Sequence, residues 1–209
     1  MGRKIVVTSG KGGVGKTTLT ASLGIAIAET GKKVVLVDAD IGLNNLDVVL
    51  AVENKVVYDV LDVISGKCRL KQALIQDVDN PTLYVLPSAK IQDSPLITAC
   101  SFRNVVDALA LNFDFVIIDC PAGIDNGFHR AVSAATEAIV VTTPHISAVR
   151  DADKVLSILS GYCLMSVGLV VNRVRGDMVS KGEMMSAGDI VRAVRCEPVG
   201  VIPEDDSIT

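Results

Sequence analysis

Short apolar runs and longer amphipathic stretches alternate along the chain. Each apolar run is three to five residues long, which is the length of a buried strand and far too short to span a bilayer. The strands predicted on this basis lie at residues 5–7, 34–37, 83–86, 115–118, 138–142, 167–171 and 199–201. Because these runs are almost continuously apolar, we expect a sheet that is covered on both faces.

Helical spacing characterises the segments between the runs. The predicted helices lie at residues 17–30, 95–112, 126–136, 148–160 and 187–195. Residues 46–75 show helical periodicity with polar breaks, with Val57, Val60, Leu61 and Ile64 on one face. Strands that alternate with helices predict an α/β fold in which a single domain, residues 1–209, contains a doubly wound, mostly parallel sheet.

The amino-acid composition and the net charge limit the kinds of core, ligand and cellular compartment that we expect. Hydrophobic residues make up 49% of the chain and aromatic residues only 3%, so we expect an aliphatic core. The net charge of −4 gives no support to nonspecific binding of nucleic acid, which requires a basic face. Five cysteines are scattered without a CxxC pair, which favours free thiols in a reducing cytoplasm. No signal peptide precedes the first strand.

A glycine-rich loop joins the first predicted strand to the first helix. It consists of Gly10, Lys11, Gly12, Gly13, Val14, Gly15, Lys16, Thr17 and Thr18. The spacing is that of a Walker A motif, whose backbone N–H groups bind phosphate oxygens at a helix N-terminus. Lys16 is expected to neutralise the β- and γ-phosphates, Thr17 to bind Mg²⁺, and Thr18 to donate to the α-phosphate. The motif therefore predicts a P-loop NTPase.

Polar residues at the ends of later strands complete the predicted site, since ligands bind at the carboxyl edge of such sheets. Asp119 follows four apolar residues, as in a Walker B motif, and is expected to bind Mg²⁺ directly or through water. Asp38 is expected to support either the Mg²⁺ shell or its own loop. Gly123 can donate its N–H to the γ-phosphate, and Pro203 offers a packing surface for the base.

The string KGGVGKTT resembles the deviant Walker A box of the MinD/ParA family, which includes the nitrogenase iron protein. The resemblance implies that Lys11 reaches across an ATP-dependent homodimer to the nucleotide of the partner subunit. It also implies that Asp40 orients the attacking water and that Asn172 and Arg173 contact adenine. ATP, ADP and Mg²⁺ are the expected cofactors, and ATP hydrolysis is the expected reaction.

Longer strings resemble the MinD branch of this family. They lie at residues 38–47, 57–66, 72–75, 147–153 and 200–209. For that branch we expect a switch that positions the division septum, with a MinC-like inhibitor and a MinE-like activator as partners. Arg150, Asp151 and Asp153 are expected in the partner-facing surface.

The MinD branch binds anionic membrane through a C-terminal amphipathic helix. No basic amphipathic stretch of that kind is visible in the sequence. We therefore expect this segment to be missing from the chain, and the intact protein to be cytoplasmic and reversibly peripheral on the inner face of the cell membrane.

Three alternatives remain from the sequence. A ParA-like partition protein normally has a basic DNA-facing surface, whereas a flagellar-number regulator shares much of the 38–47 loop. An electron-transfer protein like the nitrogenase iron protein needs two cluster-binding cysteines, and Cys100 and Cys120 lack the glycine-rich setting. A P-loop ligase needs an acid- or amine-binding pocket, which no motif marks.

Overall fold

A computed structural model describes residues 1–42, 45–89 and 94–205. Within these residues one eight-stranded sheet has the order β3-β4-β2-β5-β1-β6-β7-β8, and every neighbouring pair is parallel except β3 with β4. The strands are β1 (Arg3–Thr8), β2 (Val34–Asp38), β3 (Ile75–Gln76), β4 (Leu83–Leu86), β5 (Phe115–Asp119), β6 (Glu137–Thr142), β7 (Ser166–Val174) and β8 (Glu197–Pro203). The predicted doubly wound, mostly parallel sheet is confirmed.

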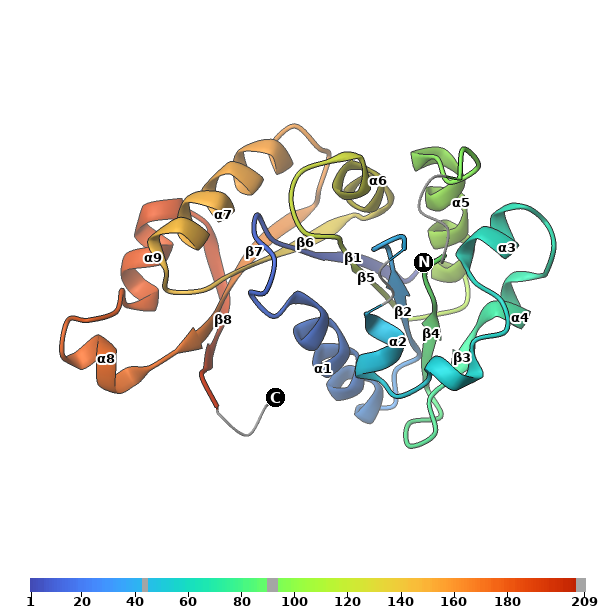
Figure 1. Ribbon diagram of the computed structural model, residues 1–209, viewed down its shortest axis with the longest axis horizontal. Helices are drawn as coiled ribbons and strands as arrows, with labels where there is room; N and C mark the ends of the chain where they lie inside the picture. The colour runs from blue at the N-terminus through green and yellow to red at the C-terminus, as the bar shows by residue number, and fades with distance from the viewer. Residues whose placement is uncertain (43–44, 90–93, 206–209) are drawn as a thin grey trace.

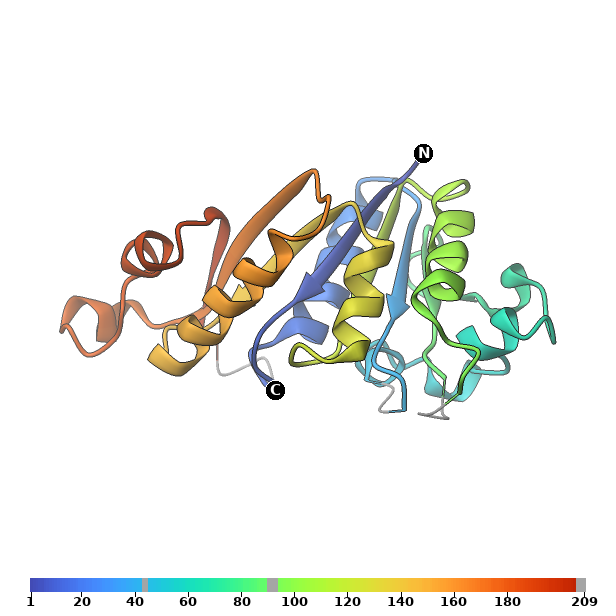
Figure 2. The same ribbon diagram turned by 90° about the horizontal axis from the view of Figure 1, so that it is seen from above.

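Helices cover both faces of this sheet. They are α1 (Lys16–Glu29), α2 (Leu46–Val49), the 3₁₀ helix η1 (Glu53–Lys55), α3 (Val60–Ile64), α4 (Leu70–Ala73), α5 (Ala99–Ala110), α6 (Asn126–Ala134), α7 (Ile146–Leu159), α8 (Gly176–Ser180) and α9 (Ala187–Val194). Helices α5, α6 and α7 lie side by side on one face, and α1 lies on the other (Figures 1 and 2). In the described part of the chain, no helix has the length and apolarity needed to cross a bilayer.

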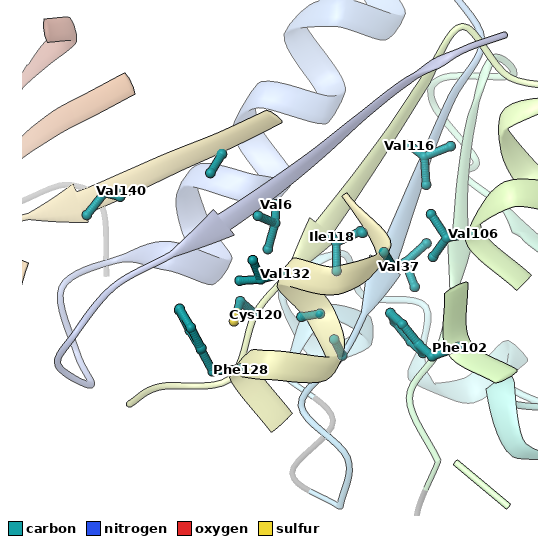
Figure 3. Packing of buried hydrophobic residues seen from close by; sticks show 14 of the residues in the cluster. Val6, Val37, Phe102, Val106, Val116, Ile118, Cys120, Phe128, Val132 and Val140 are labelled. Atoms are coloured by element: carbon teal, nitrogen blue, oxygen red, sulfur yellow. The ribbon is translucent and has the colours of Figure 1, made fainter. Parts of the chain in front are cut away.

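The two faces carry separate hydrophobic cores because neighbouring residues of a strand point in opposite directions. In β1, Val6 belongs to the core under α5, α6 and α7, whereas Val7 belongs to the core under α1. Phe102 of α5 and Phe128 of α6 are fully buried against the strands in the first of these cores (Figure 3). Burial on both faces fixes the central strands and therefore the loops at their carboxyl ends.

The sequence prediction was wrong over part of residues 46–75. The segment forms the short helices α2, η1, α3 and α4, and α3 begins where the Asp59 carboxylate accepts from the Leu61 and Asp62 N–H groups. Val57 lies outside these helices and is 75% exposed, so it is not on a buried helical face. Strand β3 and helix α8 were not predicted, whereas α5 covers much of residues 95–112, where a helix was expected. The strings at residues 38–47 and 200–209 run partly outside the described residues.

Candidate functional site

The glycine-rich loop leaves the central strand β1 and runs directly into α1. Gly13 and Gly15 have φ angles of +76° and +96°, in the left-handed region that glycine adopts without strain. Gly15 is the N-cap of α1 and supplies no side-chain cap, and the first turn contains no acidic residue. The N–H groups of that turn are consequently available to an anion. The loop therefore has the form required to bind phosphate.

Lys16, Thr17 and Asp119 converge where the loop meets the end of β5. The Thr17 hydroxyl donates to Asp119 Oδ2 over 2.7 Å, and the Thr20 hydroxyl donates to Oδ1 over 3.2 Å. Lys16 is buried beside them. Burial raises the pKa of Asp119 to about 6, although the Thr17 hydrogen bond and the Lys16 charge both oppose this shift.

This arrangement fits a divalent cation bound together with phosphate. Thr17 and Asp119 offer the hard oxygen ligands that Mg²⁺ prefers. No cluster of three or more His, Cys, Asp or Glu side chains suited to a metal occurs among the described residues. A cation here would thus depend on one carboxylate, one hydroxyl and oxygens from the nucleotide and water, as is usual for Mg²⁺ in phosphoryl-transfer sites.

Asp38 supports the loop that follows β2. Its carboxylate accepts hydrogen bonds from the backbone N–H groups of Asp40, Asn45 and Leu46, at 2.8, 3.2 and 3.2 Å. Only 1% of Asp38 is exposed, and this burial raises its pKa to about 7. The hydrogen bonds match the loop-supporting half of the prediction for Asp38, and its role toward Mg²⁺ stays a prediction.

Asp40 is half-buried in the loop that follows β2. Its N–H donates to Asp38, and its carbonyl accepts from the Ser88 hydroxyl over 3.0 Å, so the backbone is held on both sides. Burial raises the pKa of the Asp40 carboxyl, while the Lys16 and Arg130 charges oppose that shift. Asp40 thus lies two residues beyond Asp38, which pairs with Asp119 across β2 and β5, and its role toward the attacking water stays a prediction.

The first turns of α7 pack against the phosphate loop. A Cβ on Gly10 would lie 2.3 Å from the Asp151 carbonyl oxygen, so only glycine allows this approach. Lys11 is exposed, and its Nζ donates to the Ser147 hydroxyl over 3.3 Å. Arg150 and Asp153 are exposed, whereas Asp151 is half-buried. The predicted partner surface thus adjoins the loop that binds nucleotide.

The residues predicted to contact the base lie beside the same loop. Asn172 Nδ2 donates to the Val14 carbonyl over 2.8 Å, and Asn172 Oδ1 accepts from the Arg173 N–H. Arg173 lies in a pocket of about 170 Å³ with Lys11, Gly12, Gly13, Val14, Thr143, His145, Met184 and Glu204. Pro203 is exposed at the end of β8, next to Glu204.

The loop after β5 lies opposite the phosphate loop. Gly123 has a φ of +92°, and Ala122 Cβ lies 3.8 Å from the position of a Cβ on Gly12. Asp125 then caps α6 by accepting from the Gly127 and Phe128 N–H groups. Cys120 is fully buried, and this burial raises its pKa to about 12, so the thiol stays protonated.

Sequence reasoning missed three residues of this site. Thr20 follows Thr17 by one helical turn, and that spacing could have placed it on the same face. An Asp directly before a predicted helix indicates an N-cap at Asp125, but no motif connects this residue with the nucleotide site. Arg130 is the fifth residue of α6, where its Nη2 lies near the start of the helix, and no motif marks it.

Comparisons with known proteins agree with this geometry. Residues 2–161 match the family model described as an AAA domain. The septum site-determining protein MinD of Synechocystis is 49% identical over 208 residues, covering 100% of this chain and 78% of the relative.

Two solved structures share the fold and substantial sequence identity. MinD in the MinC:MinD cell division complex of Aquifex aeolicus has a TM-score of 0.90 and 43% identity, over 99% of this chain and 83% of that one. MinD of Pyrococcus horikoshii, solved with Mg-ADP, has a TM-score of 0.86 and 34% identity, over 100% and 84% of the two chains. The chain therefore belongs to the MinD septum site-determining proteins, a family of P-loop ATPases.

Proposed function

We propose that this chain is a Mg²⁺-dependent ATPase switch that dimerises on ATP and recruits a MinC-like division inhibitor to the membrane. The observation that carries the proposal is the convergence of Thr17 and Asp119 beside buried Lys16, at the open N-terminus of α1. One of the two relatives was solved with Mg-ADP and the other in a complex with MinC, which supports the same nucleotide and partner here.

Separate groups of residues are assigned to the phosphates, the cation and the base of the nucleotide. The backbone of residues 10–15 and the ammonium group of Lys16 hold the phosphates, while Thr18 donates to the α-phosphate. Thr17 and Asp119 hold Mg²⁺, with Asp38 keeping the adjacent loop in place through its three backbone hydrogen bonds. Mg²⁺ held there would neutralise part of the phosphate charge. Asn172, Arg173 and Pro203 form the side that receives the base.

Hydrolysis then depends on residues that face the γ-phosphate position. Asp40 orients the attacking water and accepts its proton. Lys11 is exposed, its Nζ donates to the Ser147 hydroxyl, and it is available to a nucleotide in a second copy of the chain. Gly123, in the left-handed region, allows its loop to change conformation when phosphate leaves.

The exposed part of α7 links nucleotide state to partners. Because Gly10 packs against Asp151, a movement of the phosphate loop is transmitted to the helix that carries Arg150 and Asp153. A MinC-like inhibitor and a MinE-like activator would bind at this surface in the ATP-bound dimer. Arg150 is basic and Asp153 is acidic, so this surface can form ion pairs with residues of either charge on a partner.

Co-sedimentation with anionic vesicles tests the switch. The chain is compared with a version that carries the C-terminal segment of the Synechocystis relative, in Mg-ATP and in Mg-ADP, with and without MinC. The proposal predicts that the extended version pellets with the vesicles in Mg-ATP and not in Mg-ADP. When MinC is present, it should pellet together with the extended version in Mg-ATP. Equal pelleting of the extended version in both nucleotides, or MinC that stays in the supernatant when the extended version pellets in Mg-ATP, contradicts it.

A further inference from the structure

Asn172 lies near the carboxyl end of β7 and is bound to the phosphate loop. Its Nδ2 donates to the Val14 carbonyl over 2.8 Å, and its Oδ1 accepts from the Arg173 N–H over 3.0 Å. These two bonds fix the orientation of the side-chain amide, because exchanging its oxygen and nitrogen would place acceptor against acceptor and donor against donor. One donor and one acceptor of the amide are therefore engaged by the protein itself.

The hydrogen bond to Val14 also sets the direction of the next N–H group in the loop. The Val14–Gly15 peptide is trans, and in a trans peptide the carbonyl and the N–H point in opposite directions. The Gly15 N–H consequently points away from Asn172. Backbone N–H groups of this kind are what a Walker A loop uses to bind phosphate oxygens. The orientation of this one peptide therefore decides whether the loop presents the Gly15 N–H to a phosphate.

The end of the phosphate loop fits closely against Asn172. The Val14 side chain is buried in the core under α1, so Val14 is held by its side chain on one side and by its carbonyl on the other. Gly15 has a φ of +96°, and a Cβ there would lie 2.4 Å from Asn172 Nδ2. Only glycine therefore allows Asn172 to approach the loop at this point.

The backbone of the residue after Asn172 is strained. Arg173 has a φ of +60°, in the left-handed region that residues with a Cβ rarely adopt, and the pairing of β7 with β8 is irregular between Val171 and Val174. Such strain persists where neighbouring contacts fix it, and it is common at ligand sites. The contact that fixes it here is the Arg173 N–H on Asn172 Oδ1. Asn172 thus holds both the phosphate loop and the residue expected to contact the base.

We propose that Asn172 is a positioning residue that holds the Val14–Gly15 peptide with its N–H directed toward the phosphates of a bound nucleotide. The inference rests on the proposed function, in which this loop binds ATP, and it goes beyond a contact of Asn172 with the base. A residue that only contacts adenine affects ligands that carry the base. A residue that orients the loop affects every ligand that carries the phosphates.

Inorganic tripolyphosphate separates these two roles because it carries phosphates without ribose or base. Asn172→Leu keeps a side chain of similar size and removes both hydrogen bonds. Titration calorimetry with Mg²⁺ present is expected to show the affinities for tripolyphosphate and for ATP lowered by a similar factor of about ten, since the Val14 carbonyl loses its partner. An unchanged affinity for tripolyphosphate together with a weaker affinity for ATP would overturn the inference, because that result assigns Asn172 to the base alone.

The matched control is Asn112→Leu. Asn112 is exposed just after α5, and its Nδ2 likewise donates to a backbone carbonyl, that of Ala108, over 3.3 Å. It lies beside Gly2 and Arg3, where β1 begins, and so at the opposite edge of the sheet from the phosphate loop. Its affinities for tripolyphosphate and ATP are expected to equal those of wild type.

NMR relaxation of the ligand-free protein tests the orientation of the loop without any ligand. Asn172→Asp keeps an oxygen for the Arg173 N–H but removes the donor to Val14. The order parameter of the Gly15 N–H is expected to fall from about 0.85 in the wild type to below about 0.6 in both Asn172→Leu and Asn172→Asp. The order parameter of the Arg173 N–H is expected to fall in Asn172→Leu only.

Two results of the relaxation measurement would overturn the inference. One is an unchanged order parameter of the Gly15 N–H in both variants, and the other is an equal decrease throughout the chain, which indicates a general loss of structure. If the wild type binds neither ATP nor tripolyphosphate, the proposed function is wrong, whereas the order parameters still decide whether Asn172 holds the loop.

Discussion

The Thr17 hydroxyl donates to Asp119 Oδ2 over 2.7 Å, although the two residues lie 102 positions apart in the sequence. This contact joins the phosphate loop to the end of β5 and brings together the two protein oxygens expected to bind Mg²⁺. Thr17→Val keeps the shape and removes the hydroxyl. We expect Mg-ATP affinity to fall about tenfold or more, the equivalent of one hydrogen bond to a charged group.

Thr17→Ser is the control for this change because it keeps the hydroxyl at the same position. Titration calorimetry with Mg-ATP should give wild-type affinity for Thr17→Ser within about threefold. Equal affinities for the valine and serine variants would contradict a role for the hydroxyl.

Asp119→Asn is expected to stabilise the ligand-free protein at alkaline pH. The folded-state pKa of Asp119 is about 6, above the ordinary value of about 3.9, so ionisation of this buried group opposes folding. The penalty is absent below about pH 4 and fully present above about pH 6. Urea unfolding in EDTA should therefore show a gain of about 1–2 kcal/mol for the variant at pH 8 and little gain at pH 4.

The same variant should lose the stabilisation that Mg-ATP gives to the wild type, because the carboxylate that binds the cation is gone. A variant that is destabilised equally at both pH values, or that still responds fully to Mg-ATP, would show that Asp119 has a different role.

Gly15→Ala should disrupt both the phosphate loop and the position of Asn172. Gly15 has a φ of +96°, and an added Cβ would lie 2.4 Å from Asn172 Nδ2. We expect a loss of about 1–2 kcal/mol of stability and a loss of ATP affinity of at least about tenfold. Urea unfolding and nucleotide titration measure the two effects separately.

Gly31→Ala provides the comparison for backbone strain alone. Gly31 has a φ of +82° with no atom within 4 Å of an added Cβ, and it lies beyond α1 at the opposite end from the site. It should lose about 1 kcal/mol of stability and keep its ATP affinity. If both alanine variants keep their affinity, the close contact of Gly15 with Asn172 has no part in nucleotide binding.

An ion pair joins the first residues of β1 and β6. Arg3 Nε donates to Glu137 Oε1 over 2.8 Å, and the hydrogen bonds from Arg3 lower the pKa of Glu137. A lowered carboxyl pKa stabilises the fold above the unfolded pKa of about 4.3, and this stabilisation disappears as the pH falls through the folded pKa.

Glu137→Gln should consequently cost about 1 kcal/mol at pH 7, and this loss should be smaller at pH 3, as measured by urea unfolding at both pH values. Glu29→Gln, at an exposed position near the end of α1, should have no effect at either pH. A pH-independent loss for Glu137→Gln would contradict the ion-pair explanation.

Most of the fold could be predicted because its strands are continuous apolar runs buried on both faces, as Val34–Val37 shows with no residue exposed. The phosphate loop could be predicted because the residues expected to bind phosphate follow one another directly in the sequence. Helix α8 could not, since none of its five residues is buried and no apolar periodicity marks it.

Hydrophobic periodicity predicts helices and strands, but it does not predict which segments that are distant in the sequence come into contact. The packing of Gly10 on Asp151 and the approach of Ala122 to Gly12 depend on how α7 and the loop before α6 lie on the sheet. Asp38 illustrates a related difficulty: its sequence position indicates a site residue, but only the structure shows that three backbone N–H groups occupy its carboxylate.

The most direct test of the central claim is sedimentation velocity in Mg-ATP and in Mg-ADP. Asp40→Ala, which should bind ATP without hydrolysing it, is predicted to sediment as a dimer in Mg-ATP and as a monomer in Mg-ADP. Lys11→Ala is predicted to remain a monomer in both. A single sedimentation coefficient for Asp40→Ala in the two nucleotides, or an ATP-induced dimer of Lys11→Ala, would contradict the nucleotide switch proposed for this chain.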